Sequence, residues 1–185
     1  RFIERVGLQP DVSAAVIASP FNYPEVATFH VPAFLEGGRI TVQGVHLLHG
    51  QPVHTTPFAL DRLFGFSSSD LAAWLEEKSS GAIRRADVQR ISGRELDAAG
   101  GPGLPRLVNR LRTLRGNVPV VVDAERQQQL CSFGAAVRAL CSEKRFLFRS
   151  AASLVRALAD PGPQPLDAAG LAGLRRRAAD GRPLP

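Results

Sequence analysis

The near-continuous apolar run Val118–Val122 constrains the fold of this chain more than any other feature of the sequence. Such a run is typical of a strand that is buried on both faces in the middle of a parallel sheet. Helical patterns flank it, a basic amphipathic one over Leu104–Leu114 and a longer one from about Glu125 to Ser142. Because strands and helices alternate, we predict an α/β fold: a layered, mostly parallel sheet with helices on both faces.

Segments on either side continue this alternation. Arg145–Phe148 predicts a strand, and Ala151–Ala159 predicts the helix that follows it. Upstream, Asp70 is typical of a helix N-cap, with apolar residues at helical spacing starting from Leu71. Shorter strands are predicted over Ser13–Ser19, Ala27–Val31 and Ala86–Ile91.

A β-hairpin is also predicted. Arg39–Leu48 contains β-branched residues in rough alternation with polar ones, which favours a strand. His49–Pro52 would turn the chain, and Val53–Thr56 would return as the partner strand. Ala98–Gly103, rich in glycine, is expected to be a flexible loop.

Length and composition indicate one globular domain. The chain has 185 residues, of which 44% are hydrophobic and 22% charged. After Asp160 several prolines precede an Ala- and Arg-rich end, so we predict a domain over residues 1–160 and a linker over 161–185. The sequence lacks any Met, and we interpret its first residue as an internal point of a longer protein.

The expected location is cytoplasmic. No apolar run approaches the roughly 18 residues that cross a bilayer, and the first residues do not resemble a signal peptide. Cys131 and Cys141 lie in one helix-like stretch, and ten residues of helix span about 15 Å, beyond disulfide reach. We therefore expect reduced cysteines and no membrane partner.

The positive charge is uneven. The net charge is +6, but residues 1–80 carry five Lys or Arg against eight Asp or Glu, and residues 81–185 carry eighteen against nine. A basic half raises the possibility of nucleic-acid binding. The few aromatic residues do not alternate with the arginines as a base-stacking surface requires, so we expect no nucleic-acid partner.

Three places could bind a ligand, because ligands of parallel sheets bind beyond the carboxyl ends of the strands. Asp123 follows the apolar strand and could contact a ligand or cap the next helix. Arg149, Ser150 and Ser153 lie in a turn from strand to helix that could hold an anion, although Ser150 could instead be an N-cap.

The third place is the loop before the predicted hairpin. Gly38 lets backbone approach a ligand closely, and Arg39 could pair with a carboxylate. A metal site is not expected, because the spacing of His46 and His49 directs them to opposite sides of a strand. The sequence contains no nucleophile elbow and no phosphate-cradling Walker loop.

Several motifs, in the same order, resemble the four-carbon acid sugar kinase family, in its N-terminal, sugar-binding domain. The strongest is Pro32-Ala-Phe-Leu-Glu-Gly-Gly-Arg-Ile-Thr, followed by a glycine and His46. The other matching segments are Thr56–Phe58, Phe64–Leu71, Val120–Ala124 and Arg145–Ser153. Together they cover roughly residues 11–160. Residues 20–31 resemble additional material, because Ser19–Phe21 and Val31–Phe34 both match the same strand end.

The resemblance implies a two-domain kinase that phosphorylates acids such as erythronate or threonate with ATP and Mg²⁺. In that family the N-terminal domain binds the sugar acid, and a C-terminal domain binds the nucleotide. It implies substrate-side roles for Gly38, Arg39, His46, Ser150 and Ser153, with Arg39 as the carboxylate partner.

This sequence lacks the family's opening Asp-Asp-Phe-Thr-Gly-Ala motif, its Lys-x-x-Asp-Ser-Thr segment and the Gly-rich nucleotide-binding domain. We therefore expect the chain to be inactive alone and to bind neither ATP nor Mg²⁺ by itself. The missing nucleotide-binding domain would be its partner, together with a small sugar acid. The alternative function is that of a non-catalytic α/β binding or interaction module that shares the fold.

Overall fold

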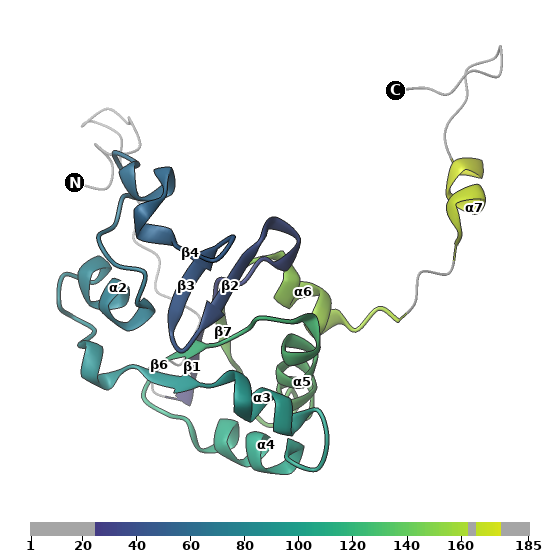
Figure 1. Cartoon of the computed structure of the whole chain (residues 1–185). Helices are drawn as coiled ribbons and strands as arrows, with labels where there is room; N and C mark the ends of the chain where they lie inside the picture. Colours follow the sequence, from purple (N-terminus) through teal and green to yellow (C-terminus); the bar gives the residue numbers. More distant parts are fainter. Residues whose placement is uncertain (1–24, 163–165, 175–185) are drawn as a thin grey trace, which may run out of the picture.

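The computed structural model describes residues 25–162 and 166–174. Its larger sheet has four strands in the order β5-β6-β1-β7, and all of its pairings are parallel (Figure 1). This confirms the predicted α/β class. The strands are β1 (Ala27–Val31), β5 (Gln89–Ile91), β6 (Val118–Val122) and β7 (Leu147–Ser150).

The two central strands bury side chains on both faces of the sheet, as the apolar run predicts. Phe29 and Val120 point into the main core, whereas Val121 points into a smaller cluster on the opposite face. The Phe29 ring lies at the centre of an aromatic group, 5.1 Å from the Phe133 ring and 5.7 Å from the Phe148 ring. Burying each such ring contributes about 1.5–3 kcal/mol to folding.

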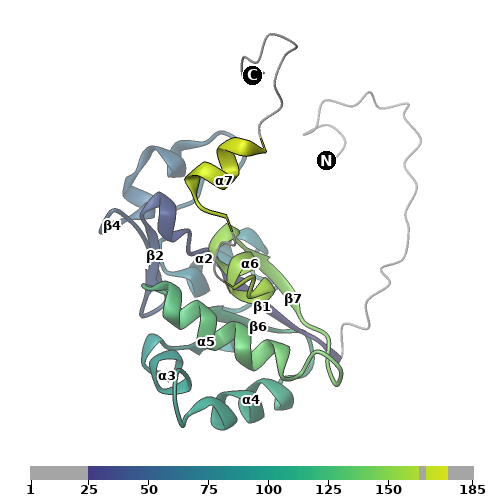
Figure 2. The same cartoon turned by 90° about the vertical axis from the view of Figure 1, so that its right-hand side faces the viewer.

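Helices cover both faces of this sheet, which is the predicted layering. Four of them pack over the main core (Figure 2), and α2 covers the other face with the small sheet beside it (Figure 1). The four are α3 (Gly93–Ala99), α4 (Leu104–Thr113), α5 (Gln127–Arg138) and α6 (Ala152–Ala159). Helix α2, on the other face, spans Leu71–Lys78. It begins where predicted, and the Asp70 side chain caps it by accepting the Ala73 N–H at 2.8 Å.

The predicted hairpin exists, but its strands are placed differently. Residues 39–48 form two antiparallel strands, β2 (Arg39–Val42) and β3 (Val45–Leu48), with the turn at Gln43 and Gly44. Both turn residues have positive φ, 51° and 81°, as in the turns that match strand twist. The third strand is the short β4 (Gln51–Pro52), and Val53–Thr55 is a 3-10 helix (η3), so the predicted return strand is wrong.

Besides η3 and a helix near the end of the chain, four short helices were not among the predictions. The 3-10 helices are η2 (Leu35–Gly37), η4 (Pro57–Leu60) and η5 (Arg85–Asp87), the last of which shortens the strand predicted over 86–91. The fourth, α3, begins at a capping box between Ser92 and Glu95, a local signal that the sequence does contain.

The end of the chain also holds a helix, α7 (Ala168–Gly173), within the segment predicted to be a linker. The strand predicted over Ser13–Ser19 lies outside the described residues. Residues 27–31, part of the segment that resembles additional material, form a central strand of the sheet. Cys131 and Cys141 are both free thiols.

Candidate functional site

A cavity of about 960 Å³ lies at the carboxyl ends of β1 and β7, between the large sheet and the hairpin. Strand β1 contributes His30, and β7 contributes Arg149 and Ser150. The hairpin closes one side with Arg39 from β2 and His46 from β3. The position is the one where α/β sheets bind ligands, and the volume lies within the range of about 300–1,000 Å³ that is usual for small-molecule sites.

Two arginines give the cavity its positive charge. The guanidinium of Arg39 lies 5.3 Å from the Phe34 ring centroid, and that of Arg149 lies 4.8 Å from the Trp74 ring centroid. Neither arginine forms an ion pair within the described part of the chain. Aromatic rings orient a guanidinium without neutralising it, so both groups keep their charge for an anion.

Two histidines of the cavity lining are buried. His46 is 6% exposed, and its Nδ1 lies 3.1 Å from the Thr41 hydroxyl. Burial, assisted by the charge of Arg39, lowers the pKa of His46 to about 4. His30 is 8% exposed, and burial followed by the charge of Arg149 lowers its pKa to about 4 as well. Both imidazoles are therefore neutral near pH 7.

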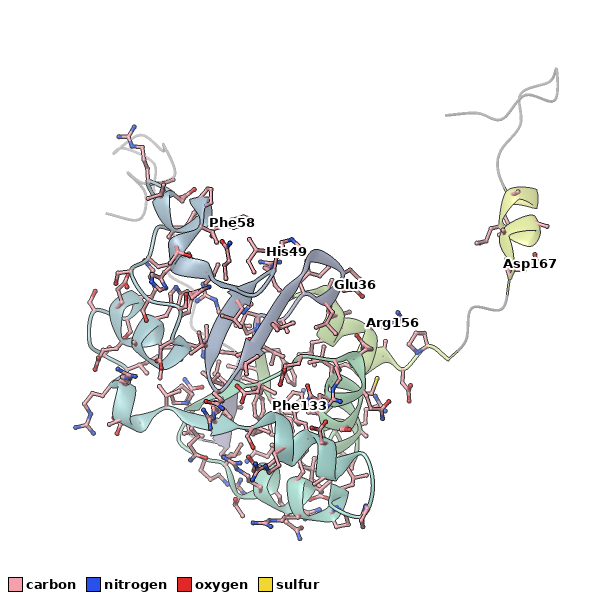
Figure 3. All side chains as sticks on the ribbon, in the orientation of Figure 1. Glu36, His49, Phe58, Phe133, Arg156 and Asp167 are labelled. Carbon is pink, nitrogen blue, oxygen red and sulfur yellow. The ribbon has the colours of Figure 1, made fainter. Side chains whose placement is uncertain are left out.

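The outer rim is apolar and comes from η4 and the turn after it. Phe58, Leu60 and Phe64 line the cavity and yet are 58%, 83% and 76% exposed. Figure 3 shows Phe58 on this outer segment, apart from the buried Phe133. Asp61 is the acidic residue of the lining, and its carboxylate accepts the N–H groups of Leu63 and Phe64.

Four of the seven residues predicted from the sequence therefore line one cavity. They are Arg39, His46, Arg149 and Ser150. Ser150 is not the cap of the next helix, since Ala151 holds that position and makes no side-chain cap. The N-cap interpretation of Ser150 is thus wrong, and its hydroxyl is left on the cavity wall.

The other three, Gly38, Asp123 and Ser153, lie outside the lining. Gly38 ends η2 with φ 68°, and a Cβ there would lie 2.2 Å from the His49 ring. Ser153 donates to the Glu36 carboxylate at 2.6 Å and accepts the Leu35 N–H at 3.0 Å, which fastens the η2 loop to α6. This hydrogen bond from Ser153 also lowers the pKa of Glu36.

Asp123 supports the hairpin. Its carboxylate is buried and accepts the N–H of Gly44, in the β2–β3 turn, at 2.8 Å, and Arg90 lies 3.9 Å away. Burial raises the pKa of Asp123. The following helix is capped at Arg126, so the N-cap interpretation of Asp123 is wrong. Together Gly38, Asp123 and Ser153 hold the elements that carry Arg39 and His46.

The sequence-based prediction missed two residues of the lining that bear on its chemistry. His30 sits in an otherwise apolar strand, and an isolated histidine there predicts no site by itself. Trp74 belongs to the apolar side of α2 and predicts only packing. The sequence did contain one signal for His30, namely a polar residue within an otherwise apolar strand. Its partner Arg149 is distant in sequence, and the two are adjacent only because of the register of the sheet.

Within residues 25–162 and 166–174, no three His, Cys, Asp or Glu side chains lie together as a metal site would require. None of the helices in the same residues is long and apolar enough to span a membrane.

Comparison with known families gives one match that covers most of the chain. The model of the sugar-binding N-terminal domain matches residues 5–158. Curated proteins give no match.

Three solved structures share the fold. The match to a Haemophilus influenzae protein has a TM-score of 0.56 at 14% identity. It covers 74% of this chain and 30% of the Haemophilus protein. The match to a Salmonella typhimurium protein has a TM-score of 0.57 at 18% identity. It covers 73% of this chain and 29% of the Salmonella protein. The third structure is a Bordetella bronchiseptica domain of unknown function, which is a domain-swapped dimer with bound citrate. This match has a TM-score of 0.54 at 22% identity and covers 72% of this chain and 29% of the Bordetella chain.

The chain thus spans about 30% of the length of these solved structures.

Proposed function

Because this chain belongs to the family of sugar-binding N-terminal domains, we propose that its cavity binds a small sugar acid. We further propose that the domain is the substrate-binding part of an ATP-dependent kinase for four-carbon sugar acids of the erythronate or threonate type. The observation that carries the proposal is a cavity at the carboxyl ends of parallel strands with two unpaired arginines, Arg39 and Arg149, among the described residues.

The chemistry of the lining suits a hydroxy acid. A guanidinium binds a carboxylate through two parallel hydrogen bonds, and such charged hydrogen bonds are about twice as strong as neutral ones. Arg39, which the hairpin aims into the cavity, is the proposed carboxylate partner. Ser150 and the neutral imidazoles of His30 and His46 offer uncharged hydrogen bonds for hydroxyl groups. The bound citrate of the Bordetella relative, itself a hydroxy acid, supports a ligand of this class.

Among residues 25–162 and 166–174, no three carboxylate, histidine or cysteine side chains converge. Phosphoryl transfer depends on positioned metal and phosphate groups. We therefore propose that a nucleotide-binding domain of the full-length protein supplies ATP and Mg²⁺, and that residues 1–185 alone bind substrate without turning it over.

Calorimetric titration of threonate and erythronate tests the proposal, with the full-length protein and with residues 1–185. Arg39→Met should weaken binding by roughly ten- to hundredfold, because a charge-assisted hydrogen-bonded pair is lost. Arg94→Met is the matched control, since Arg94 is exposed on α3 and lies outside this cavity. Equal affinity of wild type and Arg39→Met, or no binding of any sugar acid by the full-length protein, would contradict the proposal.

A second candidate, a non-catalytic interaction module, is favoured by one observation. Phe58, Leu60, Leu63 and Phe64 expose 58–83% of their surface within seven residues, and such apolar patches often mark contacts with other proteins. If full-length protein binds no sugar acid but associates with itself or with another domain, and Phe58→Ser with Phe64→Ser abolishes that association, this second function is the better description.

A further inference from the structure

His30 differs from the other buried polar groups of the described residues in having an atom without a partner. The side chain is 8% exposed, and its Nδ1 is the buried side-chain nitrogen or oxygen that makes no hydrogen bond there. By contrast, Nδ1 of the buried His46 lies 3.1 Å from the Thr41 hydroxyl. Buried polar atoms almost always have partners, so an exception in a side chain that lines a cavity needs an explanation, and a ligand group in that cavity is one.

The sheet holds His30 in a fixed place. It lies in β1, a central strand bonded on both sides, to β6 and to β7. Its register partner on β7 is Arg149, so the two side chains are neighbours on the same face. Arg149 is in turn placed against the Trp74 ring of α2. A ligand that reaches His30 therefore meets the Arg149 guanidinium beside it.

The imidazole is suited to a hydroxyl group rather than to an ion. Burial and the adjacent Arg149 lower the pKa of His30 to about 4, so that the ring is neutral near pH 7. A neutral imidazole has one N–H donor and one nitrogen acceptor. A carboxylate could pair with the N–H alone, and a cation would be repelled by Arg149, whereas a hydroxyl can pair with either ring nitrogen because it both donates and accepts.

We propose that His30 is a specificity-determining residue, whose imidazole forms a hydrogen bond with a hydroxyl of the bound acid, next to Arg149. The proposal rests on the proposed function and adds to it the ligand feature that is recognised. A site built around a hydrogen bond rejects the analogue that lacks the hydroxyl, because its own buried polar atom is then left unpaired. The cavity should therefore prefer a polyhydroxy acid to its deoxy counterparts.

The test compares threonate with each of its monodeoxy analogues by calorimetric titration of the full-length protein. Wild type should bind threonate at least roughly tenfold more tightly than one of these analogues. His30→Leu, of similar size but apolar, should reduce that preference to near unity while keeping the affinity for the analogue. His30→Asn, whose amide lies near the place of Nδ1, should restore part of the preference. His54→Leu, outside the cavity lining, is the matched control and should keep the wild-type preference.

The ratio of affinities separates recognition from folding, since a variant that is only less stable loses affinity for both acids alike. Nitrogen NMR of His30 in wild type provides a measurement that needs no variant: the signals of its ring nitrogens should shift with threonate and not with the analogue. An unchanged ratio in His30→Leu, or a His30 signal that threonate leaves in place, would overturn the proposal. Failure of wild type to bind any sugar acid would instead contradict the proposed function.

Discussion

Lowering the pH should destabilise this fold through two buried histidines, His30 and His46. The pKa of each falls from its ordinary 6.5 to about 4 in the folded protein, chiefly because burial disfavours the charged ring. In the unfolded chain both rings become protonated as the pH drops below about 6.5, while in the folded protein they stay neutral until about pH 4. The unfolded state therefore binds more protons in this window, and stability falls as the pH falls.

The size of the effect follows from the two pKa values. Between about pH 7.5 and pH 5, each histidine should lower the free energy of unfolding by roughly 2 kcal/mol. The pair should then account for roughly 4 kcal/mol, which is a large part of the 5–15 kcal/mol typical of a whole domain.

The assay is urea unfolding at several pH values across this window, followed by the fluorescence of Trp74, the single tryptophan. Carboxylates also titrate near the lower end, so the informative quantity is the difference between wild type and the double variant His30→Gln/His46→Gln. That difference should change with pH by roughly 4 kcal/mol. The control Val53→Ala, also in the cavity lining, removes no titrating group. It should lower the free energy of unfolding by the same amount at every pH. If wild type and the double variant lose equal stability on acidification, the reasoning about buried neutral histidines is refuted.

Three substitutions test how the scaffold holds the cavity. Phe133→Ala, at a fully buried ring, should lower the free energy of unfolding by about 3–5 kcal/mol in urea titration; a loss below about 1 kcal/mol would mean the core is not packed as described. Asp123→Ala removes the acceptor of the Gly44 N–H, so hydrogen exchange of that amide should accelerate roughly tenfold or more, and unaltered exchange would contradict the support of the hairpin by Asp123. Gly38→Ala should lower the melting temperature, because Gly38 has φ 68° and its new Cβ would meet the His49 ring. Adding His49→Ala should restore only the part of the melting temperature that was lost to the clash. Complete restoration would show that the positive φ of residue 38 does not destabilise the alanine variant.

The order and type of most elements could be predicted from local sequence. The apolar run Val118–Val122 forms a strand, and Asp70 caps its helix, because the strand tendency and the cap both depend on neighbouring residues. The hairpin turn was misplaced because alternation continues from Arg39–Val42 into Val45–Leu48 without a strong break. The capping box at the start of Gly93–Ala99 is also local, so that helix was predictable although it was missed.

The candidate site, like the fold, was predictable from the sequence only in part. The sequence by itself determined the order of most strands and helices and the residue types that could bind an acid, including Arg39, His46 and Arg149. Only the tertiary structure decided that these side chains share one cavity, that Asp123 supports a turn instead, and that His30 belongs with Arg149. The physical reason is that strand register and packing between the sheet and α2 bring Arg149 next to His30 and Trp74, which lie 119 and 75 positions before it, and no local pattern encodes such contacts.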